Sequence, residues 1–259
     1  MTTVINAGTI VTSRDLDLFR ALAIARVLDS EQVRIVSGFT SLRRTNRRLL
    51  KLVRAGLLRR WFVGNISGGQ KALYGLSASA ASLIGHSRQG LVRLPPESLI
   101  TNSEFLAHQQ AVNEVFLLAK YKPLPSGISC QRWLNFREPL SPSVPLMPDG
   151  YAELVQSGVV HPMFVEVDRG TETSRVWRRK VELYLKFALN GDFERIFREK
   201  RFRVLVLLHS ARRMEGIRRT VAERTEKLLW FSTQDQVVLK GLCGTIWLRP
   251  IGTERIPLL

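Results

Sequence analysis

Three carboxylates in the second half of the chain have the types and spacing of a site that handles a phosphodiester. Asp149 follows Pro148 at the predicted start of one strand, and Glu166 and Asp168 lie at the end of the next. Because side chains alternate along a strand, Glu166 and Asp168 share one face. Carboxylate oxygens suit Mg²⁺ or Mn²⁺, and such an ion polarises a phosphodiester and activates water. The spacing therefore predicts a divalent-metal site at these strand ends.

A lysine on the helix predicted to follow these strands would complete that site. Lys180 lies within the amphipathic segment 173–189, beside the core-facing stripe of Trp177, Val181 and Tyr184. Residues three or four apart share one side of a helix, so Lys180 borders the core. From that border its amine would reach back to a scissile phosphate or to an attacking water.

Structural roles for the same residues remain open. The Pro-Asp-Gly sequence at 148–150 is also ordinary turn chemistry. The two acids of the later strand could pair with Arg169 and Arg175 at the surface, and a lysine often packs its stem along apolar surface while its ammonium stays in water. Against these stands the occurrence of three carboxylates at consecutive predicted strand ends, which favours a functional site.

Strands and helices alternate in this part of the chain, which predicts an α/β (α+β) domain with a central mixed sheet flanked by helices. The segment 204–209 is almost wholly apolar, as in a buried parallel strand. A helix from 102 or 103 to about 121 is expected before the sheet. The remaining predicted elements are strands at 128–136, 151–155, 162–167, 228–231 and 245–248, and helices at 173–189 and 212–224.

The N-terminal third has the element order of a winged helix-turn-helix. Ser13 and Ser30 are predicted N-caps of two successive helices, and a third helix is predicted to start near Ser41 and run to Ala55, with Gly56 at its end. A strand at 57–63, a turn and a returning strand at 72–76 would form the hairpin. In this class of domain the third helix enters the major groove.

The positive charge of the chain is concentrated on that third helix and hairpin. Residues 41–60 hold eight Lys or Arg residues and no acid. Leu42, Leu49 and Val53 are the predicted buried stripe of the helix, and Trp61 is the tryptophan expected to touch DNA. The predicted DNA-binding residues are Arg43, Arg44, Arg47, Arg48, Lys51, Arg54, Arg59, Arg60 and Lys71. A solvated basic face on an ordinary helical subdomain is the alternative.

Composition narrows the function classes further. Because 45% of the residues are hydrophobic, the chain can bury a core. The formal net charge of +17 predicts a polyanionic partner. Its two cysteines form no C-x-x-C pair, which argues against a zinc finger and fits a reducing cytoplasm. Neither a signal peptide nor an apolar run long enough for a membrane span is expected.

These motifs together resemble the replication-relaxation family, plasmid and integrative-element proteins that include MobC-type relaxases. The resemblance covers nearly the whole chain, and its most specific part is the block from Pro148-Asp149 to Glu166-x-Asp168-Arg169-Gly170-Thr171-Glu172, followed by Lys180 and Tyr184. Further matches are Thr12-Ser13-Arg14-Asp15, Leu73-Tyr74-x-Leu76-Ser77, His108 and Asn113-Glu114. The family joins a winged helix to a restriction-endonuclease-like domain of the PD-(D/E)xK kind.

The resemblance implies a winged-helix domain at 1–85, a linker at 86–101 and a nuclease-like domain at 102–259. It makes Asp149 and Glu166 ligands of Mg²⁺ or Mn²⁺, Asp168 a third ligand or water-orienting group, and Lys180 the electrostatic stabiliser, with Glu114 as a helix-borne candidate ligand. The orthodox motif has lysine two residues after the second acid, where this chain has Asp168. Either Lys180 has taken over that role, or the site binds metal poorly and the domain is a scaffold.

Two functions follow from these observations. The first is a sequence-specific double-stranded DNA-binding protein of a plasmid or other mobile element, acting as a metal-dependent relaxase or nicking endonuclease at an origin of transfer or replication. The second is a non-catalytic replication initiator or transcriptional regulator on a degenerate nuclease fold. Duplex DNA and other replication or transfer proteins are the expected partners. A homodimer would suit a palindromic target, although no heptad is visible.

Overall fold

The computed structural model describes residues 3–5, 9–64, 68–85 and 102–259, and the predicted linker at 86–101 lies outside them. By its internal contacts the chain divides into two units, Met1–Asn113 and Glu114–Leu259. The division falls within a helix, α6 (Ser103–Lys120), rather than before it. The reason is local: Leu106 packs with Val27 and Leu73, and the Asn113 amide donates to the Val27 carbonyl.

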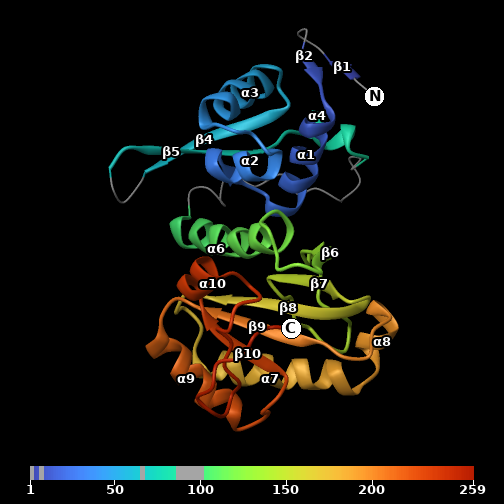
Figure 1. Ribbon diagram of the computed structural model, residues 1–259, viewed down its shortest axis with the longest axis vertical. Helices are drawn as coiled ribbons and strands as arrows, with labels where there is room; N and C mark the ends of the chain where they lie inside the picture. The colour runs from blue at the N-terminus through green and yellow to red at the C-terminus, as the bar shows by residue number, and fades with distance from the viewer. Residues whose placement is uncertain (1–2, 6–8, 65–67, 86–101) are drawn as a thin grey trace. The chain divides into compact units, whose positions relative to one another are not determined.

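The first unit has the element order expected of a winged helix-turn-helix (Figure 1). Three helices precede two antiparallel strands, and a short strand, β3, pairs with β5 to give the sheet order β3-β5-β4. A separate antiparallel pair, β1 and β2, precedes the first helix. The elements are β1 (Thr3–Ile5), β2 (Thr9–Val11), α1 (Ser13–Ala25), β3 (Leu28–Asp29), α2 (Ser30–Ser37), α3 (Leu42–Arg54), β4 (Leu58–Gly64), β5 (Gln70–Leu76) and α4 (Ala78–Leu83).

Both predicted N-caps are wrong by one residue. Thr12 caps α1 and Asp29 caps α2, whereas the predicted Ser13 and Ser30 are the first helical residues. In each case the cap forms a capping box, because the backbone N–H of the cap donates to the side chain of the residue three positions on, Asp15 or Gln32. Such a reciprocal pair satisfies two otherwise unpaired N–H groups. The third helix begins near Ser41 as predicted, and Ser41 is its cap.

The buried stripe of α3 also differs from the prediction. Thr45, Leu49 and Leu52 are buried, whereas Leu42 is 38% exposed and Val53 is only half-buried. The true stripe follows an i, i+4, i+7 spacing with a threonine at its start, and the Thr45 hydroxyl is satisfied by the Ser41 carbonyl. A polar first member conceals such a stripe from a search for apolar periodicity.

The second unit is built on a five-stranded mixed sheet flanked by helices, which confirms the predicted fold class. The strand order is β10-β9-β8-β7-β6; β6 to β8 are antiparallel, and β8, β9 and β10 run parallel through helical crossovers. The strands are β6 (Ile128–Leu134), β7 (Gly150–Gln156), β8 (Val159–Asp168), β9 (Arg203–Leu208) and β10 (Leu229–Thr233). The helices after α6 are α7 (Ser174–Leu189), α8 (Asp192–Phe197), α9 (Ala211–Ala222) and α10 (Gln234–Lys240).

One face of this sheet carries the main core and positions the site. Helices α7 and α9 lie along that face (Figure 1), and Trp177, Tyr184 and Phe187 of α7 pack there against Phe164 of β8 and its neighbours. Since β8 alternates, Glu166 and Asp168 point to the same face as Phe164. Glu166 and Asp168 therefore lie on the face of the sheet that α7 and α9 cover.

The C-terminal part of the sheet region contains elements that the sequence did not predict. Helices α8 and α10 are short, and the predicted strand at 245–248 forms only isolated bridges, Phe231 with Leu248 and Trp247 with Ile256. Within the described residues no helix is both long and apolar enough to cross a membrane.

Candidate functional site

Asp149 comes immediately before β7 and lies close to Glu166 of β8. Strands β7 and β8 pair from Gly150, which faces Val165, and the Asp149 charge is near enough to Glu166 to act on its pKa. Two bonds to the backbone of β8 hold Asp149 there: the Asp149 N–H donates to the Val165 carbonyl at 3.1 Å, and the Val167 N–H donates to Asp149 Oδ2 at 2.8 Å. Two neighbouring carboxylates repel, so their proximity costs stability unless a cation offsets it.

Lys180 is the cation that contacts Glu166 in the described part of the chain. Glu166 is 1% exposed, and Lys180 Nζ donates to its Oε2 at 2.7 Å while the Tyr184 hydroxyl donates to Oε1. Lys180 and Tyr184 are four residues apart on α7, which brings both to the same side of the helix. Lys180 therefore lies at the carboxylates, with Tyr184 as a second donor, and its contact with a phosphate or a water stays a prediction.

Burial and charge shift the titration of this cluster. Burial raises the pKa of Glu166 to about 7; Lys180 opposes the shift and Asp149 adds to it. Burial alone would lower the pKa of Lys180, but the adjacent Glu166 and Glu172 outweigh it and the pKa is raised. Burial and Glu166 raise the pKa of Tyr184, so its phenol stays protonated and remains a donor. Shifts of this kind concentrate at functional sites, although structural ion pairs produce them too.

The raised pKa of Glu166 predicts a pH dependence of stability. In the unfolded chain this carboxyl titrates near 4.5, and in the folded chain near 7. Between these values the folded state holds the proton more tightly, so the free energy of unfolding falls as pH rises through this window, by about 3 kcal/mol. Denaturant unfolding in EDTA from about pH 5 to about pH 8 should show this loss in wild type and not in Glu166→Gln. Parallel profiles for the two proteins would refute the assignment.

Asp168, the predicted third ligand or water-orienting group, is held by hydrogen bonds at both of its oxygens. It is 1% exposed; its Oδ2 accepts from Trp177 Nε1 at 2.8 Å and from Arg213 Nη2 at 2.7 Å, and its Oδ1 accepts from the Gly170 N–H. Arg213 also donates to the Glu172 carbonyl. These bonds tie the loop after β8 to α7 and α9, and the role of Asp168 at a metal ion stays a prediction.

The four predicted metal ligands do not come together as one cluster. Among the residues that the structure describes, no group of three or more His, Cys, Asp or Glu side chains is placed to share a metal ion. Asp168 is engaged as described above, and Glu114 forms a 3.9 Å ion pair with Lys122. Asp149 and Glu166 remain as two carboxylates close enough to interact.

Glu172 is the residue at this site that sequence reasoning missed. Its Oε1 lies 2.6 Å from Lys180 Nζ, and its Oε2 is buried with no hydrogen-bond partner in the described part of the chain. Glu172 immediately precedes Thr173, the N-cap of α7, which turns it toward the start of that helix. An acid next to a cap, followed by a lysine two turns along the helix, is the sequence signal that could have identified it.

Two glycines in the motif lie where a side chain would not fit. A Cβ at Gly150 would lie 2.7 Å from Trp133 Cζ2, and Gly150 is the first residue of β7. A Cβ at Gly170 would lie 2.8 Å from His209 Cε1, and the φ of +96° at Gly170 also favours glycine. The Pro-Asp-Gly sequence thus leads into a strand at a point where the indole of Trp133 packs against Gly150.

The basic residues of the first unit separate into paired and unpaired cations. Arg48 donates to Asp15 through Nε at 2.9 Å and through Nη2, and also to the Ile10 carbonyl at 2.7 Å; Lys71 pairs with Asp29 at 2.6 Å. Arg48 and Lys71, both predicted to bind DNA, are therefore engaged in ion pairs within the first unit. Within the described residues no partner is recorded for four other predicted ones, all exposed on α3: Arg43, Arg47, Lys51 and Arg54. Arg44 is also exposed and reaches Thr40.

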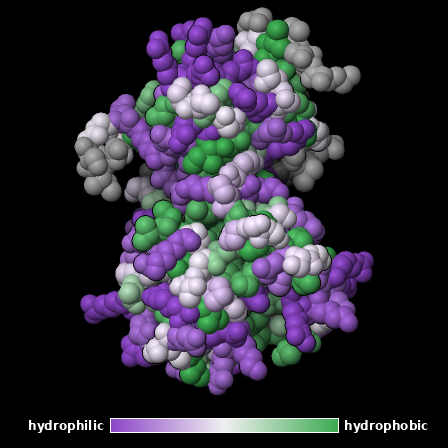
Figure 2. Space-filling model, viewed as in Figure 1, coloured by the Kyte–Doolittle hydropathy of each residue, from purple (hydrophilic) through white to green (hydrophobic). Residues whose placement is uncertain are grey.

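The unpaired cations lie on one side of α3 and beside a hollow in the surface. Their spacing of four, four and three residues places them along the outward face of the helix. Figure 2 shows hydrophilic surface over the part of the first unit that contains α3. The hollow, about 620 Å³, is lined by Thr9 and Thr12 on one side and Lys51 and Arg54 on the other, among others. Such a surface suits the phosphates of a nucleic-acid backbone.

The hairpin adds aromatic residues to this basic surface. Arg59 lies over the Trp61 ring and Arg60 over the Phe62 ring, at 4.8 Å and 4.9 Å. Trp61 packs against the apolar cluster of Val27, Leu73 and Leu106, whereas Phe62 is 54% exposed. Phe62 is therefore the more exposed of the two rings, and a contact of Trp61 with DNA stays a prediction.

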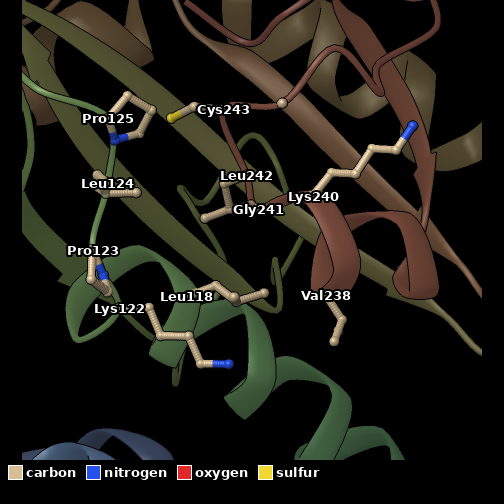
Figure 3. A pocket seen from close by; sticks show the side chains of 11 residues that line it. Leu118, Lys122, Pro123, Leu124, Pro125, Val238, Lys240, Gly241, Leu242 and Cys243 are labelled. Atoms are coloured by element: carbon tan, nitrogen blue, oxygen red, sulfur yellow. The ribbon is translucent and has the colours of Figure 1, made fainter.

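A groove in the second unit does not have the chemistry of a catalytic site. It encloses about 470 Å³ between the end of α6 and the segment after α10 (Figure 3). Leu118, Pro123 and Leu242 line it together with Lys122, Lys240 and Cys243, and no carboxylate or imidazole does. Burial raises the pKa of the Cys243 thiol, so it is a poor nucleophile near neutral pH.

Comparison with known proteins identifies the family of the chain. Two solved structures of the restriction endonuclease FokI resemble it: one with 13% identity and a TM-score of 0.33, covering 88% of this chain and 42% of that one, and one bound to DNA with 10% identity and a TM-score of 0.28, covering 88% and 43%. The chain thus spans less than half the length of these structures. No curated protein matches it. The family model for replication-relaxation proteins matches residues 19–223, so the chain belongs to the replication-relaxation family.

Proposed function

We propose that this protein binds a specific duplex DNA site through α3 and the β4–β5 hairpin, and nicks one strand with a divalent cation held by Asp149 and Glu166. An origin of transfer or replication on a plasmid or other mobile element is the proposed target. The observation that carries the catalytic part is the proximity of Asp149, just before β7, to Glu166 of β8, with Lys180 Nζ 2.7 Å from Glu166. The membership in the replication-relaxation family supports the same role.

The residues present fit one hard cation. Mg²⁺ commonly binds proteins through one or two carboxylates and completes its shell with waters and substrate phosphate oxygens, so a third protein carboxylate is not required. The buried, unpartnered Oε2 of Glu172 shows that acceptor capacity at this site exceeds the donors that the protein supplies. Burial is the main cause of the raised pKa of Glu166, and a cation between the two acids would offset the repulsion from Asp149 that adds to it.

The side chains of the protein would then have separate roles in cleavage of the phosphodiester. A bound divalent ion supplies charge neutralisation at the phosphate and an activated water. Asp149, fixed by two backbone hydrogen bonds, and Glu166, fixed by Tyr184, hold that charge in place. Lys180, held by Glu172, stays cationic and stabilises negative charge that develops on the phosphate during cleavage.

The test is nicking of supercoiled plasmid that carries the DNA flanking the gene, with Mg²⁺ or Mn²⁺ and with EDTA. The proposal expects open circles from the wild type with metal and none from Asp149→Asn. Electrophoretic mobility shift on the same DNA reports binding separately. DNA binding that is equal in wild type and variant, with no nick from either, would refute the nuclease function and leave the binding function.

That second outcome corresponds to the alternative function, a non-catalytic replication initiator or transcriptional regulator. One observation favours it: the position where the orthodox motif has lysine is Asp168, and Arg213 and Trp177 hold it as a structural residue. A regulator would bind DNA equally well with EDTA and with Asp149→Asn. A protein that fails to bind duplex DNA at all would refute both functions.

A further inference from the structure

The exposed face of α3 carries one uncharged polar residue with no hydrogen-bond partner in the described part of the chain, Asn46. Asn46 lies one turn after the exposed Leu42 and one turn before Leu50, so the three form a row along the helix. Arg43 and Arg47 follow Leu42 and Asn46 in the sequence and form the adjacent row. The helix thus presents an amide between two leucines beside a line of cations.

These two rows have different chemistry toward duplex DNA. Cations bind phosphates regardless of sequence, because every nucleotide carries the same charge. An asparagine amide has a donor and an acceptor that match N7 and N6 of adenine in the major groove, and an apolar side chain can cover the thymine methyl. In helix-turn-helix proteins the N-terminal residues of the third helix reach the base edges, and Leu42 and Asn46 lie in the first two turns of α3.

We infer that Asn46 determines sequence specificity by binding an adenine in the major groove, with Leu42 against the methyl of a thymine. The inference rests on the proposed binding of duplex DNA through α3. It explains why an apolar side chain, Leu42, remains 38% exposed at the start of a helix whose other exposed residues are mostly charged. It also explains why position 46 holds an uncharged amide among cations, although another cation there would serve non-specific binding equally well.

The experiment is selection from a library of DNA duplexes with a randomised centre, using the full chain at one salt concentration. Wild type should recover a motif with a fixed A·T pair. With Asn46→Ala the preference for that pair should fall roughly ten- to a hundredfold while the rest of the motif remains. Asn46→Gln should keep the adenine, because glutamine presents the same donor and acceptor. Leu42→Ser should relax the preference for thymine alone.

Lys51→Ala is the matched control on the same helix, because Lys51 is exposed and unpaired in the described residues. It should weaken binding to all sequences and leave the motif unchanged. Recovery of the wild-type motif by Asn46→Ala would overturn the inference, and so would binding by wild type without any motif. In both cases duplex binding persists, whereas failure of wild type to bind the library would refute the proposed function itself.

Discussion

Replacement of Lys180 with methionine is expected to slow nicking of the target plasmid at least a hundredfold. Removing one preorganised donor from a site that stabilises a developing anion typically costs a factor of about 10² to 10³. Glu166 at 2.7 Å and Glu172 at 2.6 Å hold the Lys180 ammonium on two sides. The ammonium is therefore fixed in place, and a neighbouring side chain could not readily substitute for it.

The substitution would also change the carboxylate that Lys180 contacts. Burial and Asp149 raise the pKa of Glu166, and Lys180 is the charge that opposes them. Without it the pKa of Glu166 moves further up, so more of this carboxyl is protonated at neutral pH and fewer molecules carry a competent ligand. Methionine has an unbranched side chain of similar length and removes the ammonium that lies 5.1 Å from the centre of the Trp177 ring, so the loss reports the charge rather than a cavity.

Lys186 provides the control, because it lies on the same helix and is exposed with no recorded partner in the described residues. Lys186→Met should nick at the wild-type rate, and Lys180→Arg should retain part of the activity. Unfolding curves at one pH would show whether the variants are folded. Activity of Lys180→Met within a few-fold of wild type would refute the assigned role and favour a site in which the cation alone neutralises the phosphate.

The sequence predicted that Asp149, Glu166 and Lys180 lie near one another, but not which residues Asp168 contacts. Strand alternation and the order of the strands were enough to bring Asp149 beside Glu166, and helical spacing was enough to direct Lys180 toward the core. The role of Asp168 depends on Arg213, which lies 45 residues further along the chain on α9. No local pattern connects two residues so far apart, so a structural anchor and a metal ligand look alike in the sequence.

The elements were predicted where they are long and periodic. α7 carries a continuous apolar stripe and was placed within one residue at either end, and the parallel strand β9 was recognised from its unbroken apolar run. Short elements such as α8 and α10 have too few turns to show a period, because most of their stability comes from packing. Thr12 and Ser13 are adjacent candidate caps, and so are Asp29 and Ser30. The reciprocal hydrogen bond that the first residue of each pair makes decides between them.

The charge pattern located the basic surface but could not separate its functional cations from its structural ones. Arg47 and Arg48 are neighbours with the same chemistry. A turn of 100° around the helix axis leaves Arg47 exposed and directs Arg48 at the buried Asp15, which is 33 residues away. Burial opposes and the bonds from Arg48 and Thr12 lower the pKa of Asp15, so this carboxylate is charged inside the fold. The pair therefore offers a direct comparison of the two kinds of cation.

Arg48→Ala is expected to lower the free energy of unfolding by about 3 kcal/mol, because it leaves the buried Asp15 charge without its partner. Arg47→Ala is expected to leave stability within about 0.5 kcal/mol of wild type, as for other exposed substitutions. Denaturant unfolding of the two variants measures both values. Equal stabilities would show that the Arg48–Asp15 pair contributes little to the fold.

Binding to duplex DNA should rank the same two variants in the opposite order. Arg47→Ala removes an unpaired cation from the outward face of α3, so affinity should fall for every sequence and the slope of log affinity against log salt should become shallower by about 0.9. Arg48→Ala, measured at a temperature where it is folded, should keep the wild-type slope because its charge is already neutralised by Asp15. Fluorescence anisotropy titrations over a range of salt concentrations would distinguish the two. If Arg48→Ala changed the slope and Arg47→Ala did not, the face of α3 that meets DNA would have to be reassigned to the side of the helix that contacts α1.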